Sequence, residues 1–188
     1  FQATRARRRK VLKYLLAANA KVNVANRQQL TPLIAAAYNG DRKTVQLLLK
    51  HGADPKAKDR TGKTALVYAS GKGFARIVGL LLDRGIDSNT RYENELTALM
   101  WAAGHSNDVP SQAALKTVKL LLSKGAKPDL RDNRGRTALM TAAEMGHLRI
   151  VDHLVGIGAK TDLRDKEGHT ALDFAENTGH TEVVKLLR

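Results

Sequence analysis

The chain has 188 residues and a mass of 20.5 kDa, which suits one ordinary domain and is too short for two large ones. Hydrophobic residues make up 43%, which excludes a disordered chain, and the absence of cysteine excludes disulfides, thiolate zinc sites and a cysteine nucleophile. The whole formal net charge of +14 lies within residues 1–92, so an electrostatic partner is expected to meet the first half of the chain.

The first segment in chain order, RARRRK at residues 5–10, is the most concentrated run of positive charge. Such a run suits contact with nucleic acid, an anionic lipid surface or an acidic protein, or a nuclear import signal. It also precedes Leu12 and Leu16 at helical spacing, so a solvated helix face is the alternative interpretation. Only Tyr14 lies nearby, whereas a base-stacking surface needs several rings, which favours an acidic protein over nucleic acid.

Three short words then recur in register along the chain. The first word (TPLIAA, TALVYA, TALMWAA, TALMTAA, TALDFA) has spacings of 33, 33, 40 and 33 residues and begins at Thr31, Thr64, Thr97, Thr137 and Thr170. A leucine-rich word such as LLLKHGAD follows in each unit except the last, and a turn word such as DRTGKT precedes the threonine in three of them. These words predict an internal repeat with a period of about 33 residues.

Each word has a physical role in a unit of two helices. The threonine hydroxyl is expected to cap the first helix, and Pro32 suits its first turn. Small pairs such as Ala36 and Ala37 allow close approach of neighbouring helices, and glycines such as Gly52 end the second helix in a left-handed conformation. No unit can bury its apolar face alone, so stacking into a solenoid is predicted.

These words resemble the ankyrin repeat family, whose unit is a turn followed by two antiparallel helices with a TPLHxA signature. The resemblance covers nearly the whole chain and implies an all-α solenoid in a single domain, residues 1–188. The first unit is expected to contribute its second helix, with its first helix absent or degenerate, and the last unit to lack its tail. The expected units are 1–26 (partial), 27–59, 60–92, 93–132, 133–165 and 166–188.

The 40-residue spacing adds seven residues to the fourth unit, within residues 104–116 and between its two helices. Loop closure entropy grows slowly with length, so a tolerated insertion is one interpretation. A partner-specific finger beside Trp101 is the other.

The resemblance also implies that partner proteins bind to the turn tips and to the exposed side of the first helices. Trp, Tyr and Arg are enriched at binding hot spots. The alternative is that the rings only fill gaps between helices, and Phe174, in a terminal unit, is the weakest candidate among them. The expected partner-binding residues are Arg27, Tyr38, Arg60, Lys63, Tyr68, Arg91, Leu96, Trp101, His105, Arg134 and Met145.

Motifs of catalysis are not found. TGKT at residues 61–64 resembles part of a phosphate loop, but position 57 holds Ala57 where that loop needs glycine. Neither GxSxG nor HExxH occurs, and the histidines fall at scattered repeat phases apart from His147 and His180, which are expected to make structural hydrogen bonds. We expect no enzyme activity, no cofactor and no metal.

The sequence therefore predicts a monomeric, non-catalytic adaptor or inhibitor that binds an acidic region of a partner protein through its concave face. Phrases such as TALMWAAGHSNDVP loosely resemble stand-alone bacterial ankyrin proteins, which implies a periplasmic or exported inhibitor of an enzyme from the same cell, with the cytoplasm as the next choice. The start at Phe1 rather than Met is compatible with a removed leader. The competing hypothesis is a binder of nucleic acid or an anionic surface through residues 5–13.

Overall fold

The computed structural model describes residues 1–104 and 109–188. In these two ranges the chain forms twelve α-helices, one 3-10 turn and no strand. The elements are α1 (Gln2–Arg5), α2 (Arg9–Ala17), α3 (Pro32–Tyr38), α4 (Arg42–Lys50), α5 (Ala65–Gly71), α6 (Ala75–Leu82), η1 (Glu93–Glu95), α7 (Ala98–Ala103), α8 (Ser111–Ser123), α9 (Ala138–Glu144), α10 (Leu148–Gly156), α11 (Ala171–Asn177) and α12 (Thr181–Leu187).

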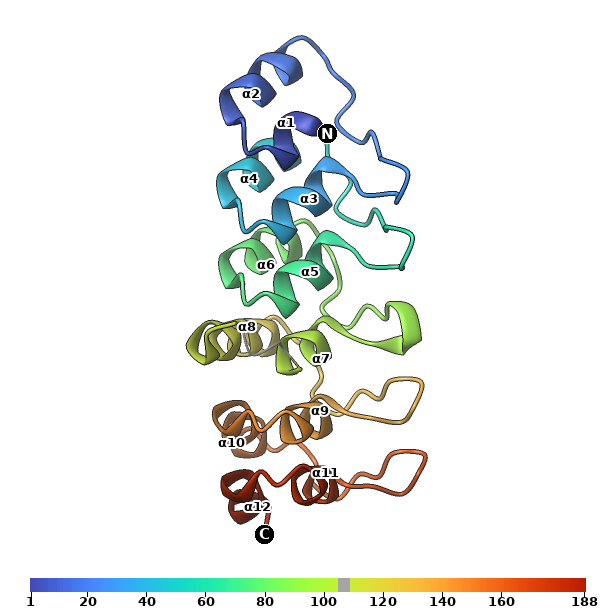
Figure 1. Cartoon of the computed structure of the whole chain (residues 1–188), viewed down its shortest axis with the longest axis vertical. Coiled ribbons are helices and arrows are strands. Elements are labelled where there is room, and N and C mark those ends of the chain that lie inside the picture. The colour runs from blue at the N-terminus through green and yellow to red at the C-terminus, as the bar shows by residue number, and fades with distance from the viewer. Residues whose placement is uncertain (105–108) are drawn as a thin grey trace.

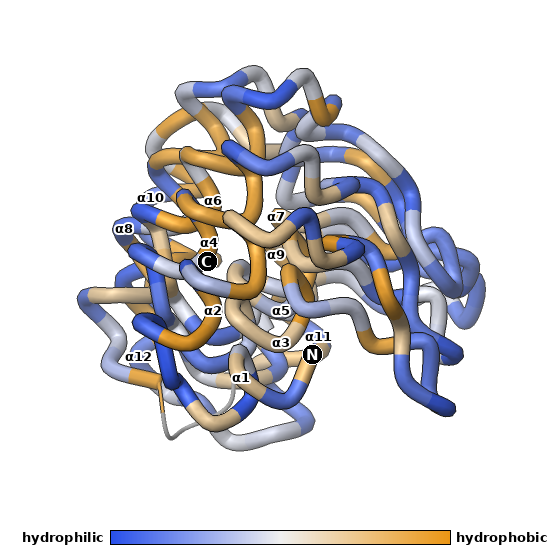
Figure 2. The backbone as a smooth tube through the Cα atoms, turned by 90° about the horizontal axis from the view of Figure 1, so that it is seen from above, coloured by the Kyte–Doolittle hydropathy of each residue, from blue (hydrophilic) through white to orange (hydrophobic). Residues whose placement is uncertain are grey.

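The helices form six pairs that stack along one axis (Figure 1). Seen from above, the odd-numbered and even-numbered helices form two layers, and the connecting hairpin loops project to one side (Figure 2). Each first helix packs on the first helix of the next pair, as α3 does on α5 and α9 on α11. The predicted all-α solenoid is confirmed.

The first pair contains a helix in the place of a first helix, because α1 lies against α3. A first helix of four described residues, Gln2–Arg5, is therefore present in the first unit rather than absent. The second helix, α2, buries Leu12 and Leu16 as the spacing predicted.

Local hydrogen bonds explain why each first helix starts where it does. The hydroxyl of Thr31 accepts the backbone N–H of Ile34 at 3.3 Å, and the same cap recurs at Thr64, Thr97, Thr137 and Thr170. The second helices α2, α4, α6, α8 and α10 are each followed by a left-handed residue. Its φ is 81° at Gly52 and 58° at Asn19, the residue that the first unit has in place of glycine. Both expectations are confirmed, and each depends on groups only a few residues apart in the chain.

A carboxylate holds most of the hairpin turns. Asp59 Oδ1 accepts the N–H groups of Thr61 and Lys63 at 2.8 and 3.0 Å. Asp132 and Asp165 repeat this pattern in later units, which confirms their interpretation as turn residues. These bonds fix the direction in which the turns project from the helices.

The core is a thin layer repeated along the stack. Leu48, Leu66, Leu99 and Leu139 are each at most 1% exposed. The apolar positions form one continuous cluster from α1 to α12, as expected when neighbours supply each other's core.

The insertion in the fourth unit is partly helix. Helix α8 has 13 residues, whereas α4 and α10 have nine each, so four of the seven added residues extend the second helix. Pro110 stands at the start of α8, and Val109 is buried. The added residues therefore do not all lie between the two helices, as the sequence predicted, because α8 begins at Ser111 and buries Ala114.

Candidate protein-binding groove

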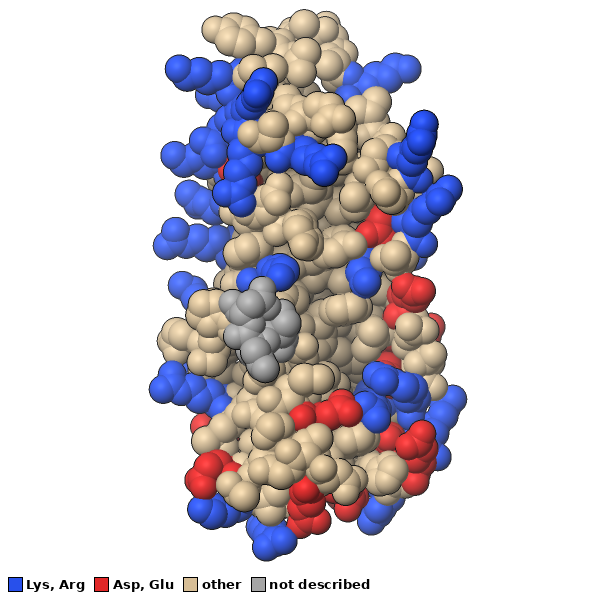
Figure 3. Space-filling view, viewed as in Figure 1, with Lys and Arg blue, Asp and Glu red and all other residues tan. Residues whose placement is uncertain are grey.

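A groove runs along the first helices beside the hairpin loops, on the face shown in Figure 3. Two adjoining cavities hollow its N-terminal half. One of about 450 Å³ lies between α1, the first hairpin loop and α3, and one of about 250 Å³ lies between α3, α5 and α7. Tyr38 and Tyr68 line both cavities, so the two form one continuous channel. We call this channel, with Tyr38, Tyr68 and Trp101, the aromatic groove.

The three rings come from successive first helices. Tyr38 ends α3 and is 51% exposed, while Tyr68 of α5 and Trp101 of α7 are half-buried. The rings of Tyr38 and Tyr68 meet edge to face, with centroids 5.5 Å apart and planes at 84°. The Trp101 ring lies beside Gly71 of the preceding first helix. Tyr68 and Trp101 thus fill gaps between helices and also line the groove.

Tyr68 is fixed to the neighbouring turn. Its hydroxyl donates to Asp59 Oδ2 at 2.6 Å. Burial raises the pKa of Tyr68, and the hydrogen bond to Asp59 adds to this, giving about 12. Burial also acts to raise the pKa of Asp59, but hydrogen bonds from Tyr68, Thr61 and Lys63 outweigh it and the net shift is downward. The pair therefore stays as phenol and carboxylate, which holds the Tyr68 ring in the groove.

Ammonium groups lie over the outer rings of the groove. Lys63 Nζ is 5.1 Å from the centroid of the Trp101 ring, and Lys72 Nζ is 5.9 Å from that of Tyr38. Both distances fall within the range of cation–π attraction. The indole Nε1 of Trp101 is buried and has no hydrogen-bond partner among the described residues. The N-terminal half of the groove thus combines apolar rings with positive charge.

The C-terminal half carries its own counter-charges. Arg136 pairs with Glu144 at 2.9 Å and lies 3.6 Å from Asp165, and its guanidinium stacks 4.2 Å from the Phe174 ring centroid. Phe174 is only 7% exposed, so it belongs to the core and is not open to a partner. Acidic side chains accompany the basic ones in this half of Figure 3, whereas basic ones dominate the other half.

The predicted arginines of the turn tips fall into two groups. Arg27 and Arg60 are exposed at the tips of the first two hairpin loops. Arg91 donates to the carbonyl of Arg131 at 2.7 Å, linking successive loops, and Arg134 pairs with Asp132 of its own turn at 2.9 Å. Arg91 and Arg134 therefore stabilise loops. Of the four predicted arginines, Arg27 and Arg60 are the two whose side chains form no ion pair or hydrogen bond among the described residues.

The remaining predicted residues lie apart from the rings. Leu96 is half-buried and packs on the core beneath the third hairpin loop. Met145 follows α9 and is 46% exposed. His105 lies outside the described residues. The structure thus brings together Tyr38, Lys63, Tyr68 and Trp101 around the second cavity.

The basic run divides among several contacts. Arg7 donates to the carbonyl of Asn39 at 2.8 Å, and Arg9 pairs with Asp41 at 2.9 Å, so both tie the first unit to the second. Arg5 instead lines the larger cavity of the groove. Sequence reasoning missed this role of Arg5, although subtracting one repeat of 33 residues from Tyr38 reaches it.

A metal site finds little support among the described residues. One group of three potential ligand residues, Asp165, Glu167 and His169, lies close enough to share an ion. Asp165 Oδ1 already accepts the backbone N–H groups of the other two, so the group is explained as a turn. His180 Nε2 lies 3.0 Å from the carbonyl of Glu144, which confirms its structural role. No described helix has the length and apolarity to cross a bilayer.

Comparison with known proteins agrees with this architecture. A family model described as ankyrin repeats (3 copies) matches in four overlapping stretches, residues 1–92, 53–111, 88–159 and 109–188. A search of curated proteins finds no match. Ankyrin repeats are generally protein–protein interaction modules and typically lack enzyme activity. With its whole length covered by the family model and its helix pairs stacked in register, this chain belongs to the ankyrin repeat family.

Proposed function

We propose that this chain is a non-catalytic, monomeric binder of an acidic region of a partner protein, and that the aromatic groove is its binding site. The observation that carries the proposal is the coincidence of Tyr38, Tyr68 and Trp101 with Lys63 and Lys72 along one open channel. Aromatic rings supply apolar contact area, and charge complementarity raises association rate and specificity.

Charge distribution supports an acidic partner. Residues 1–92 carry the whole net charge of +14, and the nearby carboxylates of Asp41 and Asp59 are already engaged by Arg9 and Tyr68. Among the described residues, neither carboxylate forms an ion pair with the Lys63 ammonium. A more specific form of the proposal is that the chain inhibits an enzyme of the same bacterial cell by occupying its surface.

The competing function is binding of nucleic acid or an anionic surface by residues 5–13. Arg7 and Arg9 are engaged by the second unit, so they do not form a free basic strip. Besides Arg5, which lines the groove, Arg8, Lys10 and Lys13 are exposed and would have to carry such binding. This division disfavours the competing function and also provides a means of testing it.

The test is quantitative capture of proteins from extracts of the source organism, followed by calorimetry with the recovered partner. Trp101→Ala is expected to weaken binding at least about tenfold, the effect of losing one hot-spot ring. Replacing Arg8, Lys10 and Lys13 with serine should leave a groove-bound partner attached. Ile157→Ala, which removes another exposed apolar side chain, is the control.

The opposite pattern would refute the proposal. If the triple serine variant loses the partner while Trp101→Ala keeps it, the basic helix is the binding site. Inhibition is tested separately, by measuring the activity of a captured enzyme as wild-type chain is added.

A further inference from the structure

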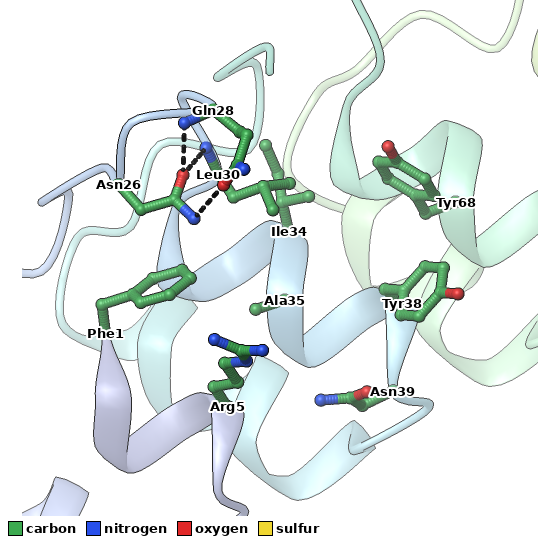
Figure 4. A pocket seen from close by; sticks show the side chains of 10 residues that line it. All are labelled: Phe1, Arg5, Asn26, Gln28, Leu30, Ile34, Ala35, Tyr38, Asn39 and Tyr68. Carbon is green, nitrogen blue, oxygen red and sulfur yellow. Dashed lines mark hydrogen bonds between the residues drawn. The ribbon is translucent and has the colours of Figure 1, made fainter. Parts of the chain in front are cut away.

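The larger cavity of the groove lies where one repeat lacks a ring. The position four residues after the capping threonine holds an aromatic residue in three units, Tyr68, Trp101 and Phe174, and a threonine in a fourth. In the second unit the same position is Ala35. Ala35 is half-buried and lines the cavity of about 450 Å³ (Figure 4). The cavity therefore occupies the place where other units carry a large side chain.

The surroundings of this cavity share one feature with those of the Trp101 and Phe174 rings, a nearby cation. Lys63 lies over Trp101, and Arg136 lies over Phe174. At Ala35 a cation is also present, because Arg5 of α1 lines the same cavity. In the described parts of the chain, the Arg5 side chain makes no hydrogen bond or ion pair. The cavity thus has a cation beside it, as the rings of Trp101 and Phe174 have, although Arg5 occupies another repeat position than Lys63 and Arg136.

The other walls of the pocket are mixed, and Asn26, Gln28 and Asn39 are the polar residues among them. Phe1, Leu30 and Ile34 contribute carbon atoms, and Tyr38 closes the side toward the second cavity. Its volume lies within the range of about 300–1,000 Å³ typical of ligand pockets. Because the pocket opens into the second cavity through Tyr38 and Tyr68, an extended polypeptide suits the site better than an isolated small molecule.

From these observations we propose that the cavity beside Ala35 receives an aromatic side chain of the partner, carried on a segment with neighbouring Asp or Glu residues. The ring takes the place left by Ala35 between Arg5 and Tyr38, and an adjacent carboxylate pairs with the Arg5 guanidinium. This inference rests on the proposed function and specifies the partner segment that the groove recognises. Cation–π contact and apolar burial provide the attraction to the ring.

The test uses two fluorescein-labelled probes, the peptides Ser-Glu-Asp-Glu-Phe-Glu-Asp-Glu-Ser and its Phe→Ala counterpart, and fluorescence anisotropy with the chain of residues 1–188. The Phe peptide is expected to bind about tenfold more tightly than the Ala peptide, in keeping with one buried anchor. Equal affinities would overturn the inference.

Ala35→Tyr is the decisive variant, since the same repeat position already holds Tyr68 in the next unit. It should abolish the tenfold preference for the Phe peptide. Arg5→Gln should weaken the Phe peptide about tenfold, whereas Arg8→Gln, which removes the same charge outside the cavity, should have a much smaller effect. A preference that survives Ala35→Tyr in a variant folded by circular dichroism would overturn the inference. If Ala35→Tyr does not fold, equal loss with Arg5→Gln and Arg8→Gln would overturn it.

Failure of this inference is distinguishable from failure of the proposed function. Trp101 is the only tryptophan of the chain, so its fluorescence reports occupancy of the second cavity. If a captured partner binds Trp101→Ala more weakly but binds Ala35→Tyr as well as wild type, the proposed function stands and the inference of an aromatic anchor is refuted. If Trp101→Ala leaves the affinity for the partner unchanged, the proposed function itself is refuted.

Discussion

Replacing Tyr68 with phenylalanine removes the hydroxyl that donates to Asp59 Oδ2 over 2.6 Å and keeps the ring. A hydrogen bond to a charged acceptor contributes about 1.5–3 kcal/mol to stability. Tyr68 is half-buried, so the lower end of this range applies, and Tyr68→Phe should lower the free energy of unfolding by about 1.5 kcal/mol. Asp59→Asn should cost about 2 kcal/mol, because it also weakens the bonds to Thr61 and Lys63.

The assay is urea unfolding of wild type, both single variants and the double variant. Because the two groups share one bond, the double variant should be about 1 kcal/mol more stable than the sum of the single effects predicts. Tyr38→Phe is the matched control, since the Tyr38 hydroxyl makes no hydrogen bond among the described residues, and it should change stability by less than about 0.5 kcal/mol. Additive single effects, or an equal loss in Tyr38→Phe, would refute the reasoning.

The same pair gives a second readout at high pH. The pKa of Tyr68 is raised to about 12, so the fold favours the neutral phenol. Its contribution is complete below the unfolded value of about 10 and is lost as the pH rises through the folded value. Wild type should lose more stability across this interval than Tyr68→Phe.

Three further predictions concern the scaffold. Gln29 has φ of 60° at a position that is glycine in three other units. Gln29→Gly should therefore raise the free energy of unfolding, measured in urea, by about 0.5–1 kcal/mol. A lower free energy of unfolding would contradict this prediction. Arg136→Met should cost about 3 kcal/mol in the same assay, because Glu144 and Asp165 lose their cation, and an unchanged midpoint would count against it. The pKa values of Asp59 and Asp165 are lowered in the fold, so the stability that these carboxylates contribute is complete above about pH 4 and is lost as the pH falls. Circular dichroism should follow acid unfolding at lower pH. Asp59→Asn should reduce the stability lost between neutral and acid pH.

Much of the fold followed from short-range chemistry that sequence reveals directly. The threonine caps, the glycine helix ends and the aspartate turns are hydrogen bonds or backbone conformations within a few residues, so their motifs predict them reliably. The 33-residue register then predicted the stacking. The insertion was harder to interpret, because the choice between loop and helix depended on whether Ala114 found a core to face.

The binding surface could be predicted only in part. Trp101 and Phe174 occupy the same repeat position, yet one lines the groove and the other is buried. Likewise, Arg5 lines the larger cavity of the groove and Arg136 lies over a ring, but only Arg136 has acidic partners. These are Glu144 and, in the next repeat, Asp165. The repeat words by themselves determined where the helices start, end and stack, because those features depend on neighbours in sequence. Only the tertiary structure decided which rings remain open and which cations remain unpaired, because exposure and ion pairing depend on side chains contributed by adjacent repeats.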